Sequence, residues 1–181
     1  MGHFNPQELS NLAWAYATAG HESPALFDAI AAAAMPRVVD YNPQNIANTV
    51  WAFATTGRRA PALFDAIAEA GTVSIDEFNA QNLANTVWAY ATIGHAAPDL
   101  FSAVTKSVAM RVGAFKSQEL ACMAWGFATA GHISPLLFRS LAETAAVRGV
   151  TDFKPLGVAN STYHTPSQPY TLRPTHPCGS D

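Results

Sequence analysis

A period of 37 residues constrains the fold of this chain more than any other feature of its sequence. Tryptophan recurs at this step in four similar segments, NLAWAYATAG, NTVWAFATTG, NTVWAYATIG and CMAWGFATAG. Glycine and proline recur at the same step, so the repeated positions are Trp14, Trp51, Trp88 and Trp125; Gly20, Gly57, Gly94 and Gly131; and Pro24, Pro61, Pro98 and Pro135. A fixed period in this range is typical of a repeat array, in which each unit buries its apolar face by stacking on its neighbours.

The period divides the chain into four full units and part of a fifth. We expect a helical repeat array over 4–163, with full units at 4–40, 41–77, 78–114 and 115–152 and a partial unit at 153–163. Residues 164–181 lose the period and hold four prolines. Such a composition cannot bury enough apolar surface to order itself, so we expect a disordered Pro-rich tail.

Each unit is predicted to hold two helices joined by a turn. In the first unit Asn5 and Pro6 form a start signal, because asparagine caps a helix and proline suits its first turn. Gly20 ends this helix, since glycine readily adopts the left-handed conformation found there. The second helix begins at Pro24, and only short β-branched segments such as Val38-Val39 resemble strands. The predicted fold class is all-α, an α-solenoid of about 37-residue helix-turn-helix repeats similar to HEAT, armadillo and TPR superhelices.

The first helix of each unit carries an apolar face and two other stripes. In unit two, about 100° of rotation per residue puts Ile46, Val50 and Phe53 on one face, which we expect to pack on Leu63 and Ile67 of the second helix.

The second stripe of each first helix holds the recurring Gln, Asn and Trp positions and hardly changes between units. A feature that every unit needs identically is expected to hold neighbouring units together. The indole would fill the groove between units, and the amides would satisfy buried backbone groups or one another. The alternative is that Trp and Asn contact bases by stacking and hydrogen bonding. The predicted repeat-stacking residues are Gln44, Asn48, Trp14, Trp51, Trp88 and Trp125.

The side chains of the third stripe differ between units, so each unit is able to contact a different part of a ligand. It carries small polar residues more than long charges, which suits close approach of a planar base, although a solvated helix face would also vary. The candidate base contacts are Glu8, Leu12, Asn45, Thr49, Asn82, Thr86, Glu119 and Met123.

The unit F-x-P-Q-x-L-x-N-x-x-W-A-[FY]-A-T-x-G-x-x-x-P-x-L-F resembles the octotricopeptide and heptatricopeptide repeats of organellar RNA-binding proteins. Residues 4–163 are similar to arrays in algal chloroplast translation factors, in FAST-kinase-like and RAP-domain mitochondrial proteins, and in the solenoid subunit of an RNA-editing substrate-binding complex. This resemblance implies an α-solenoid that binds single-stranded organellar transcripts, in a mitochondrion or a chloroplast, for processing, stability, editing or translation. It also implies protein partners within a ribonucleoprotein complex.

The sequence departs from that family in ways that limit which functions can be inferred from the resemblance. A RAP domain and an organelle-targeting leader are not found in the sequence, and about one base per repeat would reach only four or five bases. We therefore expect a class of function and no particular RNA target. The chain is interpreted as a piece of a longer array.

Phosphate contact requires cations, although the net charge of −3 does not mark a nucleic-acid binder. The candidate phosphate contacts are Arg37, Arg58, Arg59, Arg111 and Arg148. Three of them recur near the ends of the second helices, where a positive charge would also interact favourably with the helix dipole.

Catalytic motifs are not found in the sequence. It has no phosphate-binding loop, no His-Glu-x-x-His motif and no Cys-x-x-Cys pair, so we expect no enzyme, no metal and no cofactor. No apolar run is long enough for a membrane span. Neither a membrane nor a small-molecule substrate is expected as a partner. The alternatives to RNA binding are a protein-protein interaction scaffold, as many helical solenoids are, and a fragment without function.

Overall fold

The computed structural model describes residues 4–149, and this part of the chain contains only helices and the turns between them. The α-helices are α1 (Pro6–Ala19), α2 (Pro24–Ala34), α3 (Pro43–Thr55), α4 (Pro61–Val73), α5 (Ala80–Ile93), α6 (Pro98–Arg111), α7 (Ser117–Thr129) and α8 (Pro135–Arg148). Short 3-10 helices link the units: η1 (Met35–Asp40), η2 (Ile75–Glu77) and η3 (Val112–Ala114). The all-α prediction is confirmed for this part, whereas the predicted partial unit at 153–163 and the tail at 164–181 lie outside the described residues.

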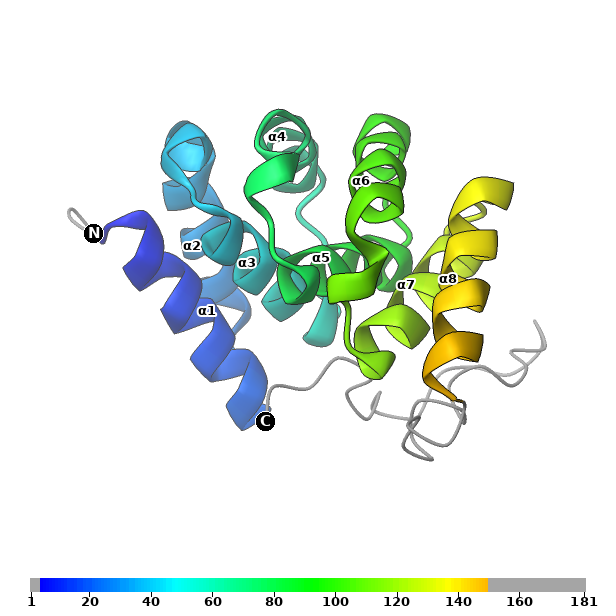
Figure 1. The fold of residues 1–181 in the computed structure, drawn as a ribbon. Coiled ribbons are helices and arrows are strands. Elements are labelled where there is room, and N and C mark those ends of the chain that lie inside the picture. The colour runs from blue at the N-terminus through cyan, green and yellow to red at the C-terminus, as the bar shows by residue number, and fades with distance from the viewer. Residues whose placement is uncertain (1–3, 150–181) are drawn as a thin grey trace.

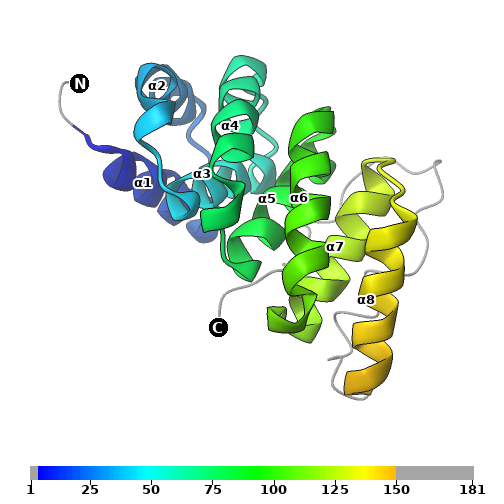
Figure 2. The same ribbon diagram turned by 45° about the horizontal axis from the view of Figure 1, so that its top comes forward.

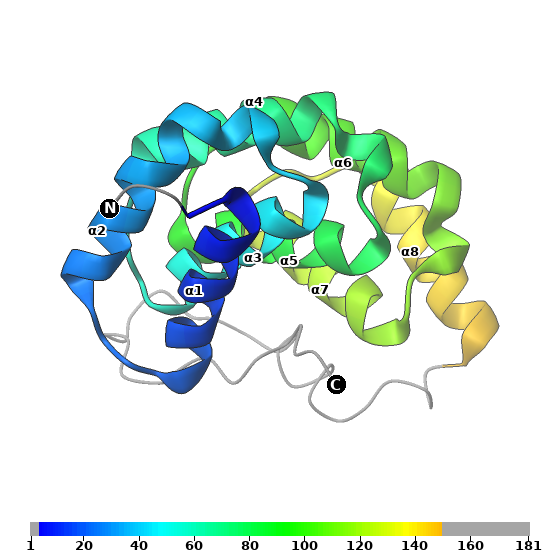
Figure 3. The same cartoon turned by 90° about the vertical axis from the view of Figure 1, so that its left-hand side faces the viewer.

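The helices form two layers (Figures 1 and 2). Helices α1, α3, α5 and α7 lie side by side in one layer, and the contacts between successive members of this layer are the most extensive in the described structure. Helices α2, α4, α6 and α8 form the other layer. Viewed from the α1 end, the second layer follows the outside of an arc and the first lies within it (Figure 3). We call them the outer layer and the inner layer.

Local capping explains where the inner helices start and end. Asn5 precedes α1, and its side-chain oxygen accepts a hydrogen bond from the backbone N–H of Glu8 at 2.9 Å. Asn42 caps α3 in the same way, accepting from the backbone N–H of Asn45 at 2.8 Å. Gly20 follows α1 with φ of 62°, a left-handed conformation that is nearly free of strain only for glycine.

The core lies between the two layers. Ile46, Val50 and Ile67 have no exposed surface, and the rings of Phe27 and Phe53 meet edge to face with centroids 5.1 Å apart. The sequence pattern assigns the face with Ile46, Val50 and Phe53 to the contact between the two helices of a unit, and the Phe27–Phe53 contact shows that this face also meets the outer helix of the preceding unit. Outer helices begin at the recurring prolines, as predicted.

Two buried tyrosines occupy this core. The Tyr90 hydroxyl donates to the backbone oxygen of Phe64 at 2.7 Å, which links α5 to α4. Desolvation and the nearby carboxylate of Asp65 raise the pKa of Tyr90 well above its usual range. Burial also raises the pKa of Tyr41 to about 12, although the positive charge of Arg37 acts in the opposite direction. Both hydroxyls therefore remain protonated near neutral pH.

The linkers are short helices and not strands. Val38-Val39, the segment that most resembles a strand in composition, lies within η1. Val38 is buried and Val39 is exposed. Covering Val38 with helical backbone lets the chain return to the inner layer without an unpaired strand edge.

Candidate nucleic-acid interface

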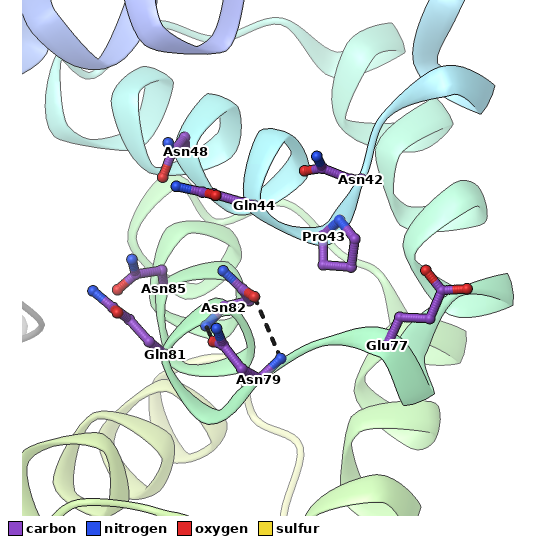
Figure 4. A pocket seen from close by; sticks show the side chains of 9 residues that line it. All are labelled: Asn42, Pro43, Gln44, Asn48, Glu77, Asn79, Gln81, Asn82 and Asn85. Carbon is purple, nitrogen blue, oxygen red and sulfur yellow. Dashed lines mark hydrogen bonds between the residues drawn. The ribbon is translucent and has the colours of Figure 1, made fainter. Parts of the chain in front are cut away.

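An open cavity of about 340 Å³ lies between the starts of α3 and α5. Its lining is dominated by side-chain amides, and Figure 4 shows them on two neighbouring inner helices. The lining residues are Asn42, Pro43, Gln44, Asn48, Glu77, Asn79, Gln81, Asn82 and Asn85. Neutral groups that both donate and accept hydrogen bonds therefore cover this part of the surface.

Three of these amides, Asn42, Asn79 and Asn82, are engaged in helix capping. The Asn79 side chain accepts from the backbone N–H of Asn82 at 2.8 Å, and the Asn82 side chain accepts from the backbone N–H of Asn79 at 3.3 Å. Asn42 and Asn45 form the same reciprocal pair at the start of α3. These bonds fix the helix starts, so the remaining amides of the cavity project from rigid elements.

The other four amides form no side-chain hydrogen bond within the described structure. Gln44 and Gln81 are exposed, and Asn48 and Asn85 are half-buried. The Asn85 side-chain oxygen is itself buried without a donor among the described residues. An unpaired buried acceptor is costly, so the fold gains nothing from a hydrogen bond at this oxygen.

The positions of Gln44 and Asn48 in α3 have equivalents on the inner helices outside the cavity. In α1 they are Gln7 and Asn11, both exposed, and in α7 the first is the exposed Gln118. The second position in α7 is Cys122, which is buried. We call the uninterrupted set the amide row: Gln7, Asn11, Gln44, Asn48, Gln81 and Asn85.

The predicted stacking residues divide into two groups. Trp51 and Trp88 are 6% and 2% exposed, and their ring centroids lie 6.5 Å apart between α3 and α5. Trp14 is 39% exposed, since no inner helix precedes α1 in the described structure. Gln44 and Asn48, by contrast, line the open cavity between α3 and α5. The predicted stacking role of these two amides stays a prediction, with Gln44 exposed and Asn48 half-buried.

Four of the eight candidate base contacts are buried inside the inner layer. Thr49, Thr86 and Met123 have no exposed surface, and Leu12 is half-buried. Asn45 is buried and donates to the Ser10 hydroxyl of α1 at 3.2 Å, which shows that this stripe faces the preceding inner helix. Base contact at these positions stays an untested prediction, and their burial disfavours it.

The remaining candidate base contacts share one structural role; they are Glu8, Asn82 and Glu119. Each stands three residues after the helix cap, and its side chain accepts a hydrogen bond from the backbone N–H of the cap residue at 2.8, 3.3 and 2.7 Å, respectively. A carboxylate and an amide oxygen both serve as acceptors here, so the position varies without loss of its capping role.

Three of the candidate phosphate contacts lie at the edge of the inner layer where its helices start. Arg37 donates to the Phe4 oxygen at 2.9 Å, and Arg111 donates to the Ile75 oxygen at 3.1 Å. Arg148 donates to the Phe115 oxygen. Each bond reaches the linker or the residue just before an inner helix, so these guanidinium groups lie beside the helix starts while holding the units together.

The other two candidates lie in the turn after α3. Arg58 pairs with Asp28 of the preceding outer helix at 3.0 Å, and His95 pairs with Asp65 in the corresponding place one unit later at 2.7 Å. Arg59 is exposed and forms no ion pair or side-chain hydrogen bond among the described residues. The structure thus separates the candidate arginines into an edge group and a turn group.

Within residues 4–149, no three His, Cys, Asp or Glu side chains come together in an arrangement that could hold a metal ion. No helix of the same part of the chain has the length and apolar character that a membrane span requires.

Sequence reasoning identified Gln44 and Asn48 but assigned them to stacking, and it missed Asn42, Asn79 and Glu77 as lining residues. The signal for Asn42 and Asn79 was their position as helix caps, which places them at the same edge of the layer. No sequence signal indicated Glu77, whose place depends on the path of η2.

Comparison with protein families shows what the chain is similar to. A family model described as RNA-editing substrate-binding complex 6 protein matches residues 1–172. No curated protein matches the chain.

Proposed function

Since the chain belongs to the RNA-editing substrate-binding complex 6 protein family, we propose that it is a non-catalytic RNA-binding protein of organellar RNA editing. The family description names a complex that binds editing substrates, and those substrates are RNA. We further propose a mitochondrial location and protein partners within such a complex. The family match does not support a chloroplast location or an octotricopeptide assignment in particular.

We propose that the two layers are an α-solenoid built from the 37-residue units. The support is the agreement between the sequence period and the helix layout, in which one inner and one outer helix fall within each unit. Helical solenoids commonly bind extended ligands along the face of one helix layer. Here that face is the surface of the inner layer that carries the amide row.

The amide row, whose glutamines are exposed, is the observation that carries the RNA proposal. Side-chain amides match base edges, because each supplies a donor and an acceptor in one plane. Bases of single-stranded RNA are accessible to such contacts, unlike those within a double helix. The row therefore suits an unpaired strand laid across the inner helices.

Phosphate contact would come from the edge of the inner layer. Arg37, Arg111 and Arg148 lie there, next to helix N-termini that favour anions. A guanidinium group has five N–H donors, so a group bonded to backbone oxygens retains others for a phosphate. Glu77 opposes this attraction within the cavity, which predicts a modest electrostatic contribution.

A protein scaffold is the second candidate function. The net charge of −3 favours it, since proteins that bind nucleic acid chiefly through phosphates are usually basic. An amide-rich surface also suits peptide backbones, which offer alternating donors and acceptors.

Filter binding of labelled single-stranded RNA to the full chain over a salt series tests the proposal. We expect log K to fall linearly with log salt, by about 0.7 per phosphate neutralised. Gln81→Ala should weaken binding, and Glu69→Ala, on the exposed surface of the outer helix α4, should not weaken it. Absence of measurable binding at low salt would overturn RNA binding and favour the scaffold.

A further inference from the structure

The amide row repeats the same pair of residues in three successive units. The pairs are Gln7 with Asn11, Gln44 with Asn48, and Gln81 with Asn85. Members of a pair are four residues apart, so they lie one above the other on the same helix face. Three inner helices thus present the same chemical groups in the same orientation.

Hydrogen bonding within the fold does not account for this repetition. The capping amides of the same helices are bonded within the protein, whereas the amide row forms no side-chain hydrogen bond among the described residues. Surface positions without a structural role commonly tolerate substitution within about 0.5 kcal/mol. Three copies of one amide pair without a hydrogen bond in the fold therefore point to a ligand that repeats in the same way.

A repeated pair specifies a repeated base. In helical-repeat RNA readers, two or three side chains of each unit contact one base. Different bases would need different donors and acceptors, because each base edge has its own pattern. Identical pairs on α1, α3 and α5 would bind three identical bases in equivalent positions.

Resting on the proposed RNA binding, we infer that the amide row recognises a run of one repeated base, with one base for each inner helix. The fourth unit is different, since Cys122 is buried in place of the second amide. The row therefore specifies the base on α1, α3 and α5 and is more tolerant on α7. A side-chain amide can form hydrogen bonds with adenine, uracil or cytosine edges. The repeated amide pairs therefore predict a run of one base, and the binding experiment identifies which base it is.

Fluorescence anisotropy with RNA of about ten bases tests this inference, a length within the range that single-strand binding domains cover. The probes are oligo(A), oligo(U), oligo(C) and a mixed sequence of the same length. One homopolymer should bind at least about 10-fold more tightly than the mixed sequence, since a good pair discriminates between bases by a factor of this order or more.

The double variant Gln44→Met and Gln81→Met removes two amides without changing net charge or approximate side-chain length. Its binding to the preferred homopolymer should fall to the level of the mixed sequence, with an unchanged salt slope. The control Ser102→Ala, on the exposed surface of α6, should retain the preference. Circular dichroism of each variant confirms that the helices are intact.

Equal binding of all four probes by the native chain would overturn this inference while leaving RNA binding in place. A preference that survives in the double variant would overturn the role of the amide row. If no RNA of any sequence binds, both this inference and the proposed function fail, and the row is better explained as a protein contact.

Discussion

At the scale of single residues, the two buried tyrosines differ in what their hydroxyl groups contact. Tyr90 donates to the Phe64 oxygen at 2.7 Å, whereas the buried Tyr41 hydroxyl has no partner among the described residues. We expect Tyr90→Phe to cost about 1 kcal/mol of unfolding free energy, which is typical of a lost internal hydrogen bond. Tyr41→Phe should change stability by less than about 0.5 kcal/mol, since it removes only an unpaired group.

Urea unfolding of both variants at neutral pH measures the difference. Phe78 and Phe115 occupy the place of Tyr41 in the next two units and are buried there, so phenylalanine fits this site. Equal losses in the two variants would show that the Tyr90 bond does not stabilise the fold.

Asn45 and Asn82 provide a second matched pair at this scale. Both accept the capping bond, but only Asn45 also donates to Ser10 inside the inner layer. Asn45→Ala should therefore cost about 1 kcal/mol more than Asn82→Ala in urea unfolding. If Asn45→Ala instead altered RNA base preference at unchanged stability, the base-contact prediction would hold and the packing role would be wrong.

At the scale of helices, the bounds could be predicted from local rules and the orientation could not. The recurring Pro24 and Gly20 mark a start and an end because their backbone conformations suit few other places. Which stripe faces a neighbour depends on how the helices pack side by side, and no single unit contains that information. Variation at Glu8 and Asn45 resembled ligand reading, but the structure gives both residues the same capping role.

The arginines at the linkers form hydrogen bonds that connect separate helices. Arg111 donates to the Ile75 and Asp76 oxygens of η2 and to the Ser107 hydroxyl. Arg111→Ala should cost about 1 to 2 kcal/mol, because bonds from a charged donor are stronger than neutral ones. The exposed Arg59→Ala should change stability by less than about 0.5 kcal/mol. Thermal unfolding of the two variants compares them, and a larger loss for Arg59→Ala would contradict this role.

At the scale of the whole molecule, stability should vary along the arc. Helices α3 and α5 each have an inner helix on both sides, whereas α1 has one on one side only within the described structure. Local opening is easiest where fewer buried contacts must break. We expect backbone amides of α3 and α5 to exchange with deuterium more slowly than those of α1. Uniform protection of all three helices would show that the described units unfold as a single cooperative block.

We propose above all that RNA binds to the amide row of the inner layer. The most direct measurement is an NMR titration of the labelled chain with the preferred RNA, observing side-chain amide signals. We expect the signals of Gln44, Asn48, Gln81 and Asn85 to shift first, while exposed groups of the outer helices stay unchanged. Shifts confined to the outer layer, with these four signals unmoved, would contradict this proposal.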